Sequence, residues 1–168
     1  MQGVCIFGLG CAPPKYFEYD FHISSLPFAA RITFGHCGST FGRKVWNSTD
    51  ERIRRVLWRC NKKYVVKGEK GCEKKHVDDK VLYKVFVEAF NAMIENKEDF
   101  MEKWQQGLQS ENVLVKYKSR EFIRIIENAN LMKEFDIDIY FKIIEKMIVF
   151  EVNKVIVTLL DGTEVVIE

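Results

Sequence analysis

The amino-acid sequence predicts an α+β fold in which strands and helices occupy separate stretches of the chain. From Leu26 to about Val77 the sequence is rich in Phe, Thr, Val, Trp and Tyr and is interrupted by glycines, which is typical of short strands and turns. From Asp78 to about Asn128, apolar residues recur at helical spacing. Near the end, Asp161-Gly162 separates two β-branched runs, which is a strong hairpin signal.

The same pattern divides the 168 residues into four segments. Residues 1–26 form an irregular leader without helical or strand periodicity, and residues 27–94 form a β-rich ribbon followed by a first helix. Residues 95–130 are a helical insertion, and residues 131–168 are a C-terminal helix plus a β-hairpin that closes on the ribbon.

Within the ribbon, two alternating runs predict a β-hairpin. They are Thr40–Trp46 and Arg54–Cys60, and the polar segment NSTDER joins them. Each arm carries one tryptophan, Trp46 or Trp58. We expect the two indoles to be cross-strand partners that pack the small sheet.

Three helices are predicted after the ribbon. Asp78 or Asp79 can cap the first, whose apolar stripe runs from Val81 to Ile94. The second covers Asn96–Leu108 and the third Leu114–Asn128. The stripes are too short for a coiled coil, so a set of packed core helices is expected.

The C-terminal segment predicts a short helix over 135–147, followed by three strands. The strands are expected at 147–152, 155–160 and 163–168, with turns at Asn153-Lys154 and Asp161-Gly162. The Asp-Gly pair predicts a type I′ turn, because that turn needs positive φ at both central residues.

Charge is distributed unevenly along the chain. Residues 43–75 contain 12 Lys and Arg against four Asp and Glu, a net charge of +8. Because the whole chain carries +2, the remainder carries −6. A basic block on an otherwise acidic protein indicates a polyanion partner for that block, with a solvated basic face as the alternative.

The cysteines favour reduced thiols or a metal site, because five is an odd number at uneven spacing. Cys37 lies in FGHCG, which has the small residues of a C-x-x-C-G metal knuckle but has Phe34 at the first thiolate position. Cys60 and Cys72 complete the candidate zinc ligands. His76 could supply a fourth, whereas His36 adjoins Cys37 and should point to the opposite face. On spacing alone these three cysteines are weak evidence for zinc, and free buried thiols are the alternative, because buried cysteine is common.

Two stretches resemble a known family. The run CGSTFGRKVWNSTDERIRRVLWRCNKK, followed by KGCEKKHVDD, is similar to the zinc-β-ribbon of the large serine recombinases, which include phage and mobile-element integrases. The tail FDIDIYFKIIEKMIVFEVNKVIVTLLDGTEV resembles the C-terminal segment of the same proteins. In the family's pattern the matching ligand positions are Phe34, Cys37, Cys60 and Cys72, and Phe34 departs from it.

The resemblance implies a small zinc-ribbon-like domain that binds one arm of a double-stranded attachment site. Other recombinase subunits are candidate partners, since a long coiled coil at the insertion contacts them in some family members, whereas the insertion here is short. The basic residues expected to contact DNA are Arg43, Lys44, Arg52, Arg54, Arg55, Arg59, Lys62 and Lys63. The family's Y-x-R-x-S motif, which carries the catalytic serine, does not occur in this sequence, so DNA cleavage by this chain is not expected.

Alternative functions remain open from the sequence. The chain could be a protein-interaction module, or a truncated remnant that docks an intact recombinase. A metal-dependent nuclease has little support, because Asp78, Asp79, Asp136 and Asp138 lie at expected helix starts. No basic n-region precedes the first apolar stretch and no run is long enough to cross a membrane, so a cytoplasmic location without membrane contact is expected.

Overall fold

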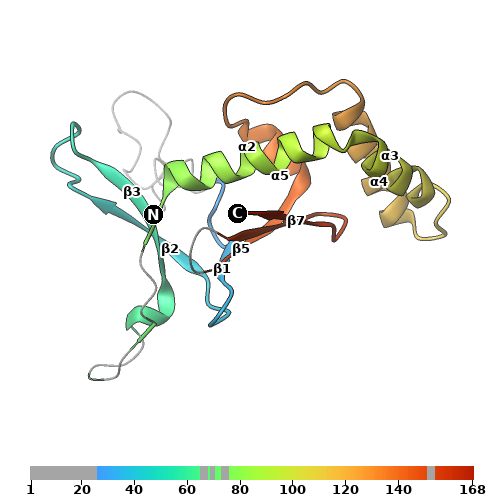
Figure 1. The fold of residues 1–168 in the computed structure, drawn as a ribbon. Helices are drawn as coiled ribbons and strands as arrows, with labels where there is room; N and C mark the ends of the chain where they lie inside the picture. Colours follow the sequence, from blue (N-terminus) through green and yellow to red (C-terminus); the bar gives the residue numbers. More distant parts are fainter. Residues whose placement is uncertain (1–25, 65–67, 69–70, 73–75, 151–153) are drawn as a thin grey trace, which may run out of the picture.

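The computed structural model describes residues 26–64, 68, 71–72, 76–150 and 154–168. The predicted leader, except for its last residue, and the turn residue Asn153 lie outside these residues. The α+β prediction is confirmed, since four helices accompany two small sheets in the described part of the chain (Figure 1).

The first sheet is the ribbon, and it has three strands in the order β2-β3-β4. Strand β2 (Phe41–Trp46) pairs antiparallel with β3 (Arg55–Cys60), which pairs antiparallel with β4 (Val77–Asp78). The short 3₁₀ helix η1 (Asn61–Tyr64) follows β3. The predicted hairpin therefore forms, with Phe41 opposite Cys60 at its base.

The second sheet has four strands in the order β1-β5-β6-β7. Strands β5 (Ile144–Val149), β6 (Val155–Leu159) and β7 (Glu164–Ile167) form an antiparallel meander. Strand β1 (Ile32–Phe34) lies parallel to β5, with Ile32 opposite Met147. Strand β1, which leads into the ribbon, thus belongs to a sheet whose other strands, β5, β6 and β7, come from the C-terminal segment.

The helices link and cover these sheets. The long α2 (Asp79–Glu95) runs from the ribbon past the second sheet to a helical pair, α3 (Lys97–Gly107) and α4 (Val113–Glu127), and α5 (Ile137–Ile143) precedes β5 (Figure 1). Helix α2 buries one face against the core, as its apolar stripe predicts. Its buried residues are Leu82, Val85, Phe86, Ala89, Phe90 and Met93.

An aromatic core joins ribbon, helix and C-terminal segment. Phe28 and Tyr140 are both fully buried, with ring centroids 5.3 Å apart, and Phe28 also lies edge-on to Trp58 at 6.0 Å. Phe86 of α2 contacts Tyr140 at the same 5.3 Å separation. Because these rings come from distant parts of the sequence, one apolar core holds the described elements together.

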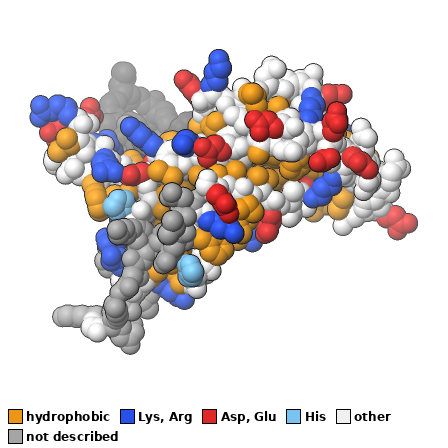
Figure 2. Space-filling model, viewed as in Figure 1, with side chains coloured by type: hydrophobic (Ala, Val, Ile, Leu, Met, Phe, Trp, Pro, Cys, Tyr) orange, Lys and Arg blue, Asp and Glu red, His pale blue; other side chains and the backbone are white. Residues whose placement is uncertain are grey.

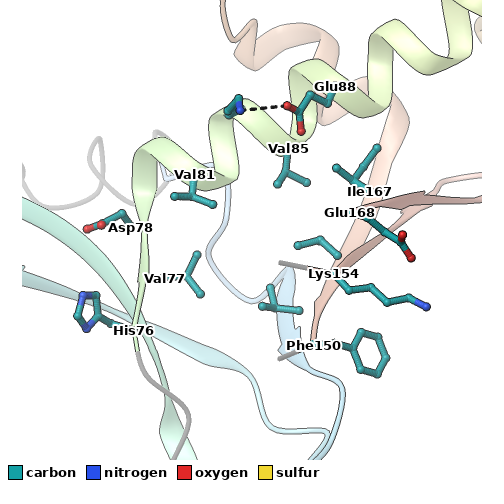
Figure 3. Close-up of a pocket in the computed structure, with 13 residues that line it drawn as sticks. His76, Val77, Asp78, Val81, Val85, Glu88, Phe150, Lys154, Ile167 and Glu168 are labelled. Atoms are coloured by element: carbon teal, nitrogen blue, oxygen red, sulfur yellow. Dashed lines mark ion pairs between the residues drawn. The ribbon is translucent and has the colours of Figure 1, made fainter. Parts of the chain in front are cut away.

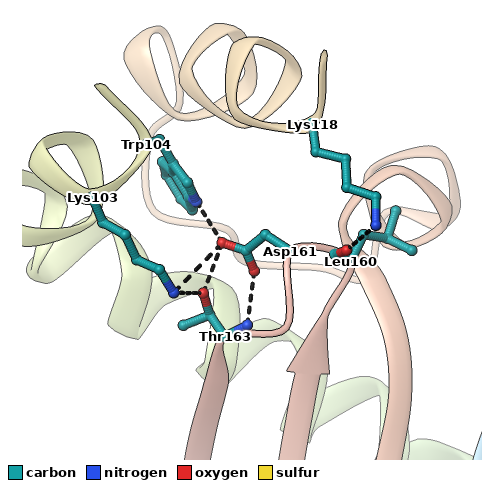
Figure 4. Close-up of polar contacts among 6 residues, drawn as sticks. All are labelled: Lys103, Trp104, Lys118, Leu160, Asp161 and Thr163. Carbon is teal, nitrogen blue, oxygen red and sulfur yellow. Dashed lines mark hydrogen bonds and ion pairs between the residues drawn. The ribbon is translucent and has the colours of Figure 1, made fainter. Parts of the chain in front are cut away.

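The helical pair crosses closely and is fixed to the β6–β7 turn. Trp104 stacks on Phe122 with centroids 4.9 Å apart, and a Cβ on Gly107 would lie 2.1 Å from the Ser119 hydroxyl. The indole of Trp104 donates to the Asp161 carboxylate at 2.7 Å, which ties α3 to the hairpin (Figure 4).

The β6–β7 hairpin is confirmed, but the predicted type I′ turn is wrong. Gly162 has φ +86°, whereas Asp161 is not among the residues with positive φ. The amide of Gly162 donates to the Leu159 carbonyl at 2.9 Å, and the Leu159 amide donates to the Thr163 carbonyl at 2.8 Å. This is a type I turn followed by a left-handed glycine, and it lets the Asp161 carboxylate accept from the Thr163 amide at 2.9 Å.

Two further expectations are corrected. The helix predicted over 135–147 ends at Ile143, because β5 begins at Ile144 to pair with β1 and β6. The two tryptophans are not cross-strand partners: Trp58 faces Arg43 and Trp46 faces Arg55, so the three-residue offset puts the indoles on opposite faces. Trp58 is 2% exposed and Trp46 is 41% exposed.

The acids at the helix starts have different roles. Asp136 caps α5 as predicted, accepting from the Asp138 and Ile139 amides. Asp78 is the N-cap residue of α2 but makes no side-chain capping bond; it pairs with Arg55 at 2.6 Å instead. Asp79 accepts from the Trp58 indole at 2.6 Å, so these two acids join the ribbon to α2.

Asp161→Asn should lower the free energy of unfolding at neutral pH by about 1–3 kcal/mol, because a charged acceptor for several donors is removed. Burial alone would raise the pKa of Asp161, but hydrogen bonds from Thr163 and Trp104 and the charge of Lys103 outweigh it and hold this pKa below its usual 3.8. A depressed pKa gives stability that is present above the unfolded-state pKa and is lost as pH falls through the folded-state value.

Urea unfolding from pH 7 to pH 3 measures this effect. The difference between wild type and Asp161→Asn should shrink as pH falls below the usual 3.8 of an aspartate. Asp138→Asn, at an exposed position, is the matched control. A difference that stays constant with pH would show that the charge of Asp161 adds nothing.

Candidate metal centre and nucleic-acid interface

The first half of the candidate metal centre is the turn between β1 and β2. The Phe34 amide donates to the Ser39 carbonyl at 2.9 Å, and the Gly38 amide donates to the Phe34 carbonyl at 2.8 Å. Gly38 closes the turn with φ +64°, a conformation that favours glycine. This tight turn carries Cys37.

The second half lies where β3 ends at Cys60. After η1 the chain returns, and the Cys72 amide donates to the Lys62 carbonyl at 3.4 Å. A Cβ on Gly71 would lie 2.6 Å from the Lys63 carbonyl oxygen. Only glycine permits this close approach of backbone to backbone, which brings Cys72 back beside Cys60.

Asn61 fastens the two halves together. Its amide donates to the Thr40 carbonyl at 3.0 Å, and its side chain donates to the Thr40 hydroxyl at 3.0 Å. Gly42 is small enough for this, since a Cβ there would lie 2.6 Å from the Asn61 side-chain oxygen. These hydrogen bonds within the protein therefore hold the β1–β2 turn beside the end of β3.

The structure brings the three predicted cysteines together. The sulfur atoms of Cys37, Cys60 and Cys72 all lie within 4.8 Å of one another, and those of Cys37 and Cys60 are 3.5 Å apart. With Zn–S bonds of about 2.3 Å, a regular tetrahedron places its sulfurs about 3.8 Å apart. The donor set and its spacing thus fit a zinc ion held by three thiolates.

The electrostatics of the three thiols are unequal. Burial alone would raise the pKa of Cys37, but hydrogen bonds from the Ser39 backbone and with Cys60 and Cys72, together with the charge of Lys62, outweigh it and lower this pKa. Burial, followed by the hydrogen bond with Cys37, raises the pKa of Cys60 to about 11. Cys37 therefore ionises before Cys60.

Phe34 is part of the apolar core rather than an empty ligand position. It is 3% exposed, and its ring meets Phe41 edge-on with centroids 6.3 Å apart. Phe41 lies opposite Cys60 in the ribbon. The phenyl ring therefore packs beside the sulfur cluster and cannot donate to a metal.

Neither candidate histidine joins the cysteines. The ring of His36 lies 5.3 Å from that of Phe34, and the described residues gather three cysteines without a histidine nitrogen among them. His76, which the sequence left open as a fourth ligand, does not join the group: its ring lies 4.7 Å from that of Trp46. Trp46 is five residues along β2 from Phe41, about 17 Å from the sulfur end of the strand.

The predicted DNA-contacting residues lie along the ribbon but differ in their partners. Arg52 pairs with Asp50 at 3.0 Å and Arg55 pairs with Asp78 at 2.6 Å. Lys62 donates to the Cys37 carbonyl at 3.1 Å. Arg59 and Lys63 are half-buried, and Arg59 has interaction partners.

Three of the predicted cations stand out as available. Arg43, Lys44 and Arg54 are exposed, and within the part of the chain that the structure describes none of them forms an ion pair. On the face shown in Figure 2, Lys and Arg gather over the ribbon, while Asp and Glu are frequent over the helices. This agrees with the charge asymmetry of the sequence.

A concave surface of about 850 Å³ lies between the tip of the ribbon and the start of α2. Its lining includes Arg52, Arg54, Arg55 and Lys80 together with Asp78 and Asp79. Sequence reasoning does not single out Lys80, which it places only at the start of a helix. The proximity of Lys80 to the arginines depends on the long-range pairing of β3 with β4.

A separate apolar groove of about 480 Å³ lies between α2, the end of β4 and the second sheet (Figure 3). Val77, Val81 and Val85 line one wall, and Phe150 and Ile167 line the other. An ion pair between two α2 side chains, Lys84 and Glu88, lies at its rim. The groove holds neither the three cysteines nor the exposed arginines, so it is distinct from both candidate sites.

Comparison with known proteins identifies the ribbon region. Residues 27–91 match the family model described as the recombinase zinc beta ribbon domain. This stretch is therefore a serine recombinase-type zinc ribbon region, as its resemblance predicted, and the match supports a recombinase-related role. It contains the three gathered cysteines. No curated protein and no solved structure matches the chain.

Among the described residues, no helix is both long enough and apolar enough to cross a membrane.

Phe34→Ala should lower the free energy of unfolding by about 3–5 kcal/mol, because it opens a cavity in the core beside Phe41. Phe34→Leu should cost less, since it keeps most of the volume. Chemical denaturation of the three proteins measures the difference. A decrease below about 1 kcal/mol for Phe34→Ala would contradict the core assignment.

Proposed function

We propose that this recombinase-type ribbon binds double-stranded DNA of an attachment site and holds one zinc ion through Cys37, Cys60 and Cys72, without cleaving the DNA. The observation that carries the proposal is the family match over residues 27–91, within which three thiols gather at the base of a basic hairpin. The exposed cations of that hairpin supply the DNA-binding surface, and the thiols supply the metal ligands.

The metal's contribution would be structural. Zinc would join the β1–β2 turn to the end of β3 and to Cys72, three points distant in sequence. Because such sites form only in the folded chain, metal binding energy adds to folding stability. Phe34 leaves the set one ligand short, so the affinity should be lower than that of a four-ligand ribbon.

DNA affinity would come from phosphate contacts. Arg43, Lys44 and Arg54 can neutralise phosphates directly, whereas Arg52 and Arg55 must exchange a carboxylate partner for a phosphate. That exchange is inexpensive because exposed ion pairs contribute little. Trp46, 41% exposed on the same face as Lys44 and Arg55, extends this surface.

A protein-interaction role is the second candidate, and the helical pair favours it. The first turn of α4 exposes several apolar side chains: Val113 at 79%, Leu114 at 58%, Val115 at 40% and, one turn on, Tyr117 at 59%. Such a cluster is typical of an interaction site. We propose another recombinase subunit as its partner, which is compatible with DNA binding by the ribbon.

Salt dependence of duplex binding tests the DNA proposal. Lys44→Glu/Arg54→Glu should weaken binding and reduce the slope of log K against log salt by about 2, one for each phosphate that is no longer neutralised. Fluorescence anisotropy with a labelled duplex from 50 to 200 mM salt, roughly the range over which phosphate contacts weaken, measures the slope.

Arg120→Glu/Lys133→Glu is the matched control, since it reverses two exposed charges away from the ribbon. Its slope should equal that of the wild type. Affinity that does not change with salt, or an equal decrease in both variants, would contradict phosphate binding by the ribbon. Arg55→Glu is a poorer probe, because it would place a carboxylate against Asp78.

Metal content tests the zinc proposal. The purified chain should contain one equivalent of zinc, and Cys72→Ser should lose it, because two thiolates remain. A saturating metal, at about 100 times its Kd, should stabilise the fold by about 2.7 kcal/mol, so a chelator should lower Tm by roughly 5–10 °C. A chelator-insensitive Tm together with no bound metal would contradict the proposal.

A further inference from the structure

Two of the three sulfurs are already in contact. The Sγ atoms of Cys37 and Cys60 lie 3.5 Å apart, although the residues are 23 positions apart in sequence. A disulfide needs about 2.05 Å, so the sulfurs must approach by roughly 1.5 Å, a distance within the reach of side-chain rotation. Asn61 holds the β1–β2 turn, which carries Cys37, beside the end of β3, which carries Cys60. The two backbone segments therefore need not move apart or together for the sulfurs to meet.

The three thiols differ in solvent exposure, and this difference sets the order in which an oxidant reaches them. Cys60 is 1% exposed, whereas Cys37 and Cys72 are half-buried and reachable from solvent. An oxidant would therefore meet Cys37 or Cys72 before Cys60. The Cys60 sulfur lies 3.5 Å from that of Cys37 and can resolve an oxidised sulfur there.

The departure at Phe34 makes the thiols less protected than in a ribbon with four ligands. A metal held by three thiolates is more easily lost, and no described histidine or carboxylate closes the group. The free thiols would then be exposed to oxidation at the distances just given.

We propose that the metal-free centre is a reversible oxidation site in which hydrogen peroxide joins Cys37 to Cys60 in a disulfide. The Cys37 sulfur attacks the peroxide O–O bond, giving a sulfenic acid and one water. The Cys60 sulfur then attacks the Cys37 sulfur, and the sulfenic oxygen leaves as a second water. Two thiols are oxidised, one peroxide is reduced, and a thiol reductant reverses the reaction.

The cross-link would preserve the ribbon while disabling its metal site. It joins the β1–β2 turn to the end of β3 and encloses the β2–β3 hairpin. Cys72 would be left as the single free thiol of the group, which cannot hold zinc alone. This inference does not depend on DNA binding, because it concerns only the base of the hairpin.

Peptide mapping of the oxidised protein tests the proposal. The full chain with Cys5→Ser and Cys11→Ser, which removes the other two thiols, is stripped of metal and treated with one equivalent of peroxide. Two of three thiols should disappear, the mass should fall by about 2 Da, and digestion should yield a peptide linking Cys37 to Cys60 that dithiothreitol separates. Predominant linkage through Cys72, or sulfinic acid without a cross-link, would overturn the proposal.

Single variants and zinc provide the controls. Cys72→Ser should form the same link, which shows that Cys72 is not required, whereas Cys37→Ser should not form it. Saturating zinc should slow the cross-linking several-fold, because the thiolates are then metal ligands. Equal rates with and without bound zinc would refute the assignment of this reaction to the metal-free state, and failure of zinc to bind would leave the disulfide result unaffected.

Discussion

The parallel pairing of β1 with β5 is the constraint on which the rest of the structure depends. It puts three residues near the start of the described chain into a sheet made by its end. Arg31 reinforces the pairing: its guanidinium donates to the Ile144 carbonyl at 2.6 Å and lies 5.0 Å from the centre of the Phe141 ring. Because β1 leads directly into the turn that carries Cys37, the sulfur cluster is positioned by the second sheet as well as by the ribbon.

This arrangement explains how the ribbon can tolerate Phe34. A ring at this position extends the apolar core from the second sheet to the base of the hairpin, where it contacts Phe41. Core burial thus replaces part of what a fourth ligand gives other ribbons, since both connect the β1–β2 turn to its surroundings. Phe34 leaves three thiols at this centre, with no fourth donor among the described residues.

Much of the fold could be predicted from local pattern. The stripe of α2 and the alternation of β2 and β3 are strong periodic signals, and Asp-Gly indicated the last hairpin. The β1–β5 pair could not be predicted, because ITF is too short to signal a strand and its partner lies over a hundred residues away. The same pairing explains why the helix before β5 is shorter than its sequence suggests.

The three cysteine ligands could be predicted from the sequence, but whether a histidine completes the set could not. The resemblance to a recombinase ribbon, more than cysteine spacing, indicated Cys37, Cys60 and Cys72, which the structure brings together. It could not show that His76 lies at the far end of the ribbon, because that depends on the pairing of β4 with β3. The role of Gly71 was equally hidden, since the glycine is required by a backbone contact rather than by a turn.

Helix α2 sets the spacing between the two ends of the molecule. Its 17 residues span about 25 Å, with Asp79 bound to the ribbon at its start and the helical pair following its end. A single inserted residue would lengthen the helix by only about 1.5 Å but would rotate everything beyond it by about 100°. Angular phase, more than length, therefore limits which changes α2 can accept: any insertion that preserves the relative orientation of ribbon and helical pair must come close to a whole number of turns.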